Sequence, residues 1–98
     1  MILDEIRNGD IKKALVSLAI EKALLEISNA VLEKVGNKLY ADYKCYFSDC
    51  YAHPEYLNTI LKDMFGKSYT KIVESIKIQL AEAVSQKPIE EFLIKLSE

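Results

Sequence analysis

The residue types best suited to chemistry in this chain are gathered in one short segment. Cys45, Cys50 and His53 are its two cysteines and its only histidine. Thiolates and imidazoles bind zinc, but a structural zinc site takes four such ligands and this segment supplies three at most. A Cys45–Cys50 disulfide would close only a very short loop and add little to stability. The spacing therefore favours two free thiols, with a disulfide and a metal site as alternatives, and we assign no metal ligand.

His53 is also a candidate for catalysis or pH sensing, because histidine is the residue type that changes charge near neutral pH. No nucleophile or acid pair stands at a recognisable spacing from it, and the chain has no glycine-rich phosphate loop. We therefore expect no catalytic residue and no cofactor. A local hydrogen-bonding role is the simpler interpretation of His53.

Aromatic side chains are dense in the same part of the chain. Five of them lie between positions 40 and 51, namely Tyr40, Tyr43, Tyr46, Phe47 and Tyr51. Aromatic rings can stack on a nucleobase or another flat ligand, and the ligand candidates of residues 43–56 are Tyr46, Tyr51 and His53. Because basic residues are not densely interleaved, the pattern favours rings that fill the space between helices.

The element around which the other segments must pack is a helix predicted over residues 11–27, with Asp10 as its N-cap. A helical wheel places its apolar residues on two arcs. The first arc comprises Ile11, Ala14, Leu15, Leu18 and Leu25. The second arc, roughly opposite, comprises Val16, Ile20, Ala23, Leu24 and Ile27.

A helix with two apolar arcs must be covered twice, either by its own domain or by a partner. We place the candidate interface on the second arc. The interface candidates are Val16, Ile20 and Leu24, together with Ile78 and Ile94, which stand apart from the apolar stripes of later helices. This predicts a protein partner, with a homodimer slightly favoured. The alternative is a monomer whose other helices enclose the central helix completely.

Four further helices are predicted, with short connections between them. The turn signal Asn8-Gly9-Asp10 precedes the central helix, and Ser28 is a suitable N-cap for a helix over 29–43. Gly36 lies inside that helix, either for close approach of another backbone or as a tolerated weak point. Residues 44–52 are expected to form an extended crossover with one turn beginning at 48–49.

The last three helices carry clearer boundary signals. Pro54 suits the first turn of a helix that Gly66 ends, with His53 as a poor N-cap. Ser68 is expected to cap a helix that runs to about Val84, and a final helix starts at 88. The fold class is therefore all-α, a compact bundle of about five helices around a central helix at about 10–27.

Composition limits the remaining function classes. The 98 residues suit a single helical domain over 1–98, with half of them hydrophobic and 29% charged. A net charge of -2 disfavours nucleic acid as a partner, although five helices could include a helix-turn-helix. No apolar run reaches the length of a membrane span. The first residues lack the basic flank and apolar core of a secretion signal, so we expect a cytoplasmic location.

One run of the sequence resembles a known family. It reads Ser48-Asp49-Cys50-Tyr51-Ala52-His53-Pro54-Glu55-Tyr56-Leu57 and is followed by Ile60-Leu61 and Phe65-Gly66. Together with Ile72-Val73-Glu74-Ser75-Ile76 and Lys87-Pro88-Ile89-Glu90-Glu91-Phe92-Leu93, it is similar to a small archaeal domain called a Nitrosopumilus output domain, formerly a domain of unknown function. The similarity covers about residues 14–96. The resemblance implies an archaeal source and a helical output or interaction module, and it provides no catalytic residues.

Two functions follow from the sequence. The first is a non-enzymatic helical interaction or signal-output module that acts through protein–protein contacts. The alternative is a small ligand-binding or catalytic domain that uses the Tyr/Cys/His segment at 43–56.

Overall fold

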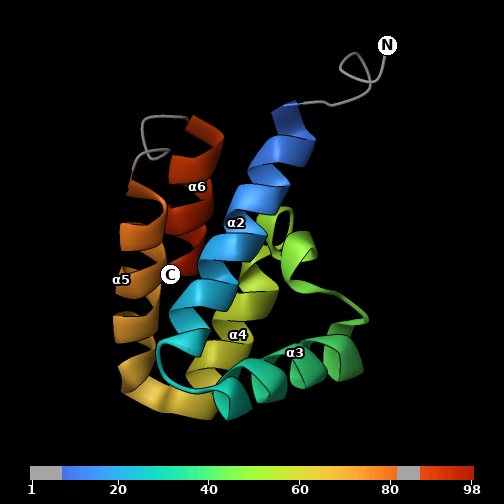
Figure 1. Ribbon diagram of the computed structural model, residues 1–98, viewed down its shortest axis with the longest axis vertical. Coiled ribbons are helices and arrows are strands. Elements are labelled where there is room, and N and C mark those ends of the chain that lie inside the picture. The colour runs from blue at the N-terminus through green and yellow to red at the C-terminus, as the bar shows by residue number, and fades with distance from the viewer. Residues whose placement is uncertain (1–7, 82–86) are drawn as a thin grey trace.

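The structure is a computed structural model that describes residues 8–81 and 87–98. Helices and their connections make up this part of the chain, which contains no strand (Figure 1). The elements are α2 (Asn8–Leu25), α3 (Asn29–Tyr43), η1 (Phe47–Tyr51), α4 (Pro54–Phe65), η2 (Gly66–Ser68), α5 (Tyr69–Gln79) and α6 (Lys87–Leu96), where η marks a 3-10 helix. The all-α prediction is confirmed.

Helix α2 crosses the front of the molecule in Figure 1, with α5 beside it and α3 across its lower end. It contacts η1, α5 and α3, while α4 packs on α3 and α6. The core between these helices is hydrophobic, and no polar or charged residue is buried among the described residues. Its largest fully buried side chains are Ile20, Leu24, Leu39, Leu57, Ile60, Leu61, Ile76, Ile89 and Leu96.

The start of α2 differs from the sequence prediction. Residues 8–10 are helical, so Asp10 lies inside the helix and the predicted turn at Asn8-Gly9-Asp10 is wrong. At the other end, the helix stops at Leu25 and the Glu26 amide still bonds to the Lys22 carbonyl at 3.0 Å. The helix that the pattern from Ile11 onward predicts extends through this local turn signal, since single-residue preferences are weak.

Helix α3 has the predicted bounds. The Val31 amide donates to Ser28 Oγ at 3.1 Å, which confirms Ser28 as the N-cap. The helix runs without a break through Gly36, where an added Cβ would lie 3.4 Å from the Phe47 ring. A side chain rather than another backbone therefore approaches this glycine. Lys44 ends α3 in the left-handed region, with φ 57°.

The crossover between α3 and α4 contains the turn that the sequence indicated, as η1. The Asp49 carboxylate accepts a hydrogen bond from the Tyr46 amide at 2.8 Å and so fixes the start of η1. Helix α4 begins at Pro54 and ends before Gly66, as predicted, and His53 makes no side-chain cap. Gly66 adopts φ 57°, which glycine reaches without steric cost.

Helix α5 is shorter than predicted, since it ends at Gln79, and its expected later residues Ala83 and Val84 lie outside the described residues. Ser68 makes no side-chain cap, so that cap prediction is wrong. The carbonyls at the end of α6 accept hydrogen bonds from three side chains of other helices, which replace the partners that a helix end lacks. These donors are Asn58 to Leu96, Lys62 to Glu98 and Tyr69 to Ser97.

Candidate functional site

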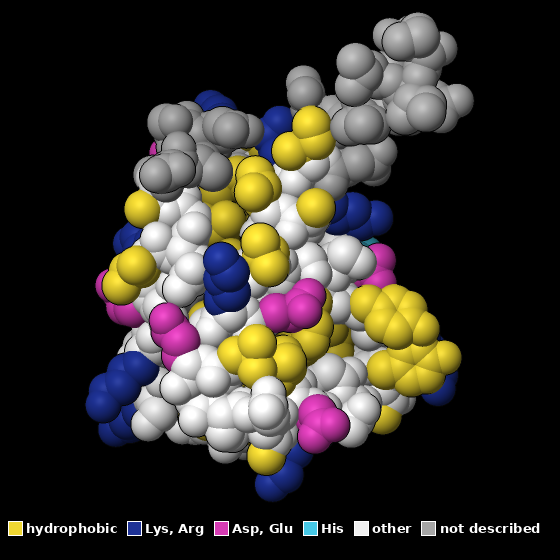
Figure 2. All heavy atoms as spheres, in the orientation of Figure 1, with side chains coloured by type: hydrophobic (Ala, Val, Ile, Leu, Met, Phe, Trp, Pro, Cys, Tyr) yellow, Lys and Arg dark blue, Asp and Glu magenta, His cyan; other side chains and the backbone are white. Residues whose placement is uncertain are grey.

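The exposed face of α2 carries a row of large apolar side chains. Ile11, Leu15, Leu18 and Leu25 are 48%, 39%, 50% and 45% exposed. We call these four residues the α2 stripe. Figure 2 shows hydrophobic side chains at intervals along α2 on the face turned to the viewer, with charged side chains between them. The stripe is the first arc of the helical wheel, left open to solvent.

Four residues of the second arc, where the sequence analysis placed the interface, belong to the core, and the fifth, Ile27, is 50% exposed beyond the end of α2. Val16, Ile20 and Leu24 are each 0% exposed. Helix α5 and η1 pack against α2 and help to enclose this side of the helix. These three residues therefore cannot contact a partner in this fold, and their assignment to an interface is wrong.

The lysines of α2 do not rank the two arcs. At 100° per residue, Lys22 lies about 20° from Ile11, inside the first arc, and Lys13 lies about 200° from Ile11, between Ile20 and Leu24 of the second arc. In the structure Lys22 is exposed and Lys13 is partly buried. Each arc therefore contains one lysine, and the helical wheel does not show which arc faces water.

The other two interface candidates are at the surface. Ile78 on α5 is 70% exposed and Ile94 on α6 is 55% exposed. Ile94 also lines an open cavity of about 340 Å³ between α5 and α6, with Lys77, Leu93 and Ser97 among its other lining residues. Both isoleucines are available for contact, and their role in an interface stays a prediction.

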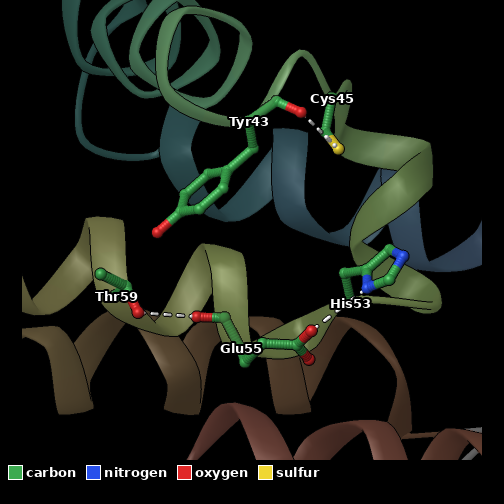
Figure 3. A network of polar contacts seen from close by, with 5 residues as sticks. All are labelled: Tyr43, Cys45, His53, Glu55 and Thr59. Carbon is green, nitrogen blue, oxygen red and sulfur yellow. Dashed lines mark hydrogen bonds and ion pairs between the residues drawn. The ribbon is translucent and has the colours of Figure 1, made fainter.

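The Tyr/His part of segment 43–56 forms a stack of three rings. Tyr43, at the end of α3, lies 4.1 Å from Tyr56 between ring centroids, with the planes 3° apart. His53 lies on Tyr56 at 4.6 Å and 10°. Figure 3 shows Tyr43 pointing from α3 toward α4, beside His53 and Glu55. The stack joins α3 to the start of α4, so these rings fill the space between helices.

The polar contacts around the stack are local. His53 Nδ1 and Glu55 Oε2 are 3.1 Å apart, and Thr59 Oγ1 donates to the Glu55 carbonyl at 2.9 Å (Figure 3). The pKa of the Glu55 carboxyl is lowered, first by the backbone amide of Glu55 and then by its hydrogen bond to His53, against an opposing effect of burial. Both side chains of this pair are largely exposed. The simpler interpretation of His53, a local hydrogen-bonding residue, fits this geometry.

The three ligand candidates are not gathered around one cavity. Tyr46 pairs with Tyr40, with ring centroids 5.4 Å apart, and both rings are exposed. Tyr51 lines an open cavity of about 220 Å³ with Pro54, Phe92 and other residues, but neither Tyr46 nor His53 lines it. His53 belongs to the ring stack. A ligand site that uses all three residues would need a different arrangement.

The two cysteines are free thiols, as the sequence favoured. Cys50 is 1% exposed, and burial raises the pKa of its thiol to about 12. A thiol in this environment stays protonated and unreactive at neutral pH. Cys45 is half-buried and its Sγ donates to the Tyr43 carbonyl at 3.3 Å.

The described residues contain neither a metal-binding cluster nor a membrane-spanning helix. Within residues 8–81 and 87–98, no three His, Cys, Asp or Glu side chains are close enough together to hold a metal ion. None of the helices in this part of the chain combines the length and apolar character of a membrane span. Comparison with models of protein families, with curated proteins and with solved structures found no match.

Proposed function

We propose that this chain is a non-enzymatic helical interaction module that binds a protein through the α2 stripe. The observation that carries the proposal is the contrast between the two faces of α2. Val16, Ile20 and Leu24 are fully buried on one face, while four large apolar side chains are exposed in a row on the other. Large apolar side chains exposed together on one face of a helix favour a protein-binding site.

The stripe offers a moderate free energy of binding. Full burial of a Leu or Ile side chain contributes about 1.5–3 kcal/mol. Because each side chain of the stripe is about half exposed, a partner would gain about 1 kcal/mol from each. The sum over the four side chains is small against the free-energy cost of association, which is about 4–15 kcal/mol. The module is therefore suited to weak or regulated association, unless the partner adds contacts outside the stripe.

The ligand-binding alternative has less support. Tyr43, Tyr56 and His53 stack on one another, so the inner faces of these rings are already covered. The exposed pair Tyr40 and Tyr46 is too close for a flat ligand to enter between the rings, since its centroids are 5.4 Å apart. The archaeal source, the resemblance to the output-domain family and the cytoplasmic location stay predictions.

A capture experiment tests the proposal. The tagged chain and its Leu15→Glu/Leu18→Glu variant are used as baits in extract from the native cells. We expect proteins, other copies of the chain included, to bind the unaltered bait and to be lost from the variant. Tyr40→Glu is the control, because it replaces a large exposed side chain on α3, outside the stripe and the interface candidates, and should retain those partners. Equal capture by all three baits, with circular dichroism showing intact helices, would mean that the stripe binds no protein.

A further inference from the structure

The spacing of the α2 stripe specifies the shape of its occupant. The four residues of the stripe are spaced at steps of four, three and seven positions, from Ile11 to Leu15, Leu18 and Leu25. Exposed Lys22 divides the last step into four and three. Alternating steps of four and three are the a and d positions of a coiled-coil seam. A surface with this repeat fits the side of another α-helix. Lys22 then occupies an a position, where a single polar residue specifies register and oligomer state, while the flanking e and g charges set orientation.

We propose that the occupant is the α2 helix of a second copy of this chain, in antiparallel orientation about a two-fold axis. This rests on the proposed function and names its partner. In a symmetric pair, one contact covers the stripes of both copies at once. The charges beside the stripe decide the orientation.

A parallel pair would bring like charges together. Lys22 would face Lys22 of the other copy across the seam. Glu21 and Glu26 are five residues apart, the spacing at which a g position of one helix meets an e position of a parallel partner. Two carboxylates would therefore meet on each side of the seam, and such contacts are destabilising.

An antiparallel pair brings opposite charges together. On the helical wheel Lys12 and Glu26 lie on the same flank of the stripe, at about 100° and 60° from Ile11. Glu26 faces α5 on this flank, since its carboxylate accepts hydrogen bonds from Ser75 at 2.6 Å and Gln79 at 3.3 Å. Antiparallel helices related by a two-fold axis place matching flanks side by side, so Lys12 of each copy approaches Glu26 of the other. On the opposite flank the same register brings the two copies of Glu21 together. Among these residues the antiparallel pair therefore has two opposite-charge contacts against one like-charge contact, whereas the parallel pair has only like-charge contacts.

The same arrangement suits Lys22. Opposite it lies an apolar residue of the partner's stripe rather than a second Lys22. Its aliphatic stem can pack along that residue while the ammonium group reaches water. The antiparallel pair therefore leaves no buried charge in the seam.

Sedimentation equilibrium of the purified chain tests the pairing directly. We expect the mass to rise from 11.2 kDa toward twice that value between low micromolar and millimolar concentration. Leu15→Glu/Leu18→Glu should stay at the monomer mass, and Tyr40→Glu should dimerise like the unaltered chain. A monomer mass at every concentration would overturn the inference, as would loss of the dimer in Tyr40→Glu. The proposed function would still stand if the capture experiment finds a stripe-dependent partner.

A charge exchange tests the orientation. Lys12→Glu and Glu26→Lys should each weaken dimerisation by roughly tenfold, because each reverses one partner of two symmetric ion pairs. The double variant Lys12→Glu/Glu26→Lys should dimerise like the unaltered chain again. Within one chain these residues are fourteen positions apart, about 21 Å along the helix, so restoration can only come from contact between copies. A double variant that is weaker than both single variants would exclude the antiparallel arrangement.

Discussion

The rings of Tyr43 and Tyr56 stack face to face, with centroids 4.1 Å apart and planes within 3° of parallel. One comes from the last residue of α3 and the other from the first turns of α4, so the pair fixes how these two helices meet. His53 extends the stack, with its ring centroid 4.6 Å from that of Tyr56. A segment with the residue types of a ligand site thus serves as a joint between helices.

The coupling between these two rings is measurable. In a double-mutant cycle of Tyr43→Leu and Tyr56→Leu, urea unfolding should give a coupling free energy of about 0.5–1.5 kcal/mol, the usual value for an aromatic pair. The exposed ring of Tyr46 makes no contact of this kind with Tyr56, and Tyr46→Leu should add to Tyr56→Leu without coupling. Independent effects of Tyr43 and Tyr56 would show that the stack contributes nothing to stability.

The two faces of α2 should respond very differently to the same substitution. Leu24 is 0% exposed and Leu18 is 50% exposed on the same helix. Leu24→Ala should lower the free energy of unfolding by about 2–5 kcal/mol, the usual cost of truncating a buried leucine. Leu18→Ala should change it by less than about 1 kcal/mol when measured on dilute protein. Similar losses in both variants would contradict the orientation of α2 described above.

Two serines before helices give a matched test of capping. Ser28 Oγ accepts from the Val31 amide at 3.1 Å, whereas Ser68 makes no side-chain cap. Ser28→Ala should therefore reduce the free energy of unfolding by about 1 kcal/mol. Ser68→Ala should have almost no effect, and thermal or urea unfolding of the two variants compares them directly. A larger loss from Ser68→Ala than from Ser28→Ala would reverse the cap assignment.

The buried thiol of Cys50 should make the free energy of unfolding decrease as the pH rises through the alkaline range. Burial raises the pKa of this thiol to about 12, from 9.0 for an ordinary cysteine. Between these values the unfolded chain releases the proton while the folded chain keeps it, so rising pH favours unfolding. The contribution of the buried thiol to the free energy of unfolding is fully present below pH 9. It decreases as the pH rises above 9, by at most about 1.4 kcal/mol per pH unit.

Comparison with Cys50→Ala isolates this effect, because all other titrating groups are shared by the two proteins. The free energy of unfolding of the unaltered chain should fall more steeply above pH 9 than that of Cys50→Ala. Parallel curves from pH 8 to about pH 11 would mean that Cys50 ionises as readily in the folded chain as in the unfolded one.

Local signals in the sequence were sufficient for most of the elements. The bounds of α3 and α4 follow from Ser28, Pro54 and Gly66, because capping and proline or glycine geometry depend only on near neighbours along the chain. The all-α class follows from the periodicity of apolar residues. Such signals failed at Asp10, which lies inside α2, and at Ser68, whose side chain makes no cap.

The orientation of α2 was decided only by tertiary structure. Both of its arcs are apolar enough to be buried, so periodicity defined two faces and did not rank them. Val16, Ile20 and Leu24 are buried in the core, whereas Leu15 and Leu18 are exposed to solvent. The same holds for Tyr43 and Tyr56, whose stacking depends on how α3 meets α4. Contacts between residues distant in sequence set which apolar surface is left over, and that surface carries the function proposed for this chain.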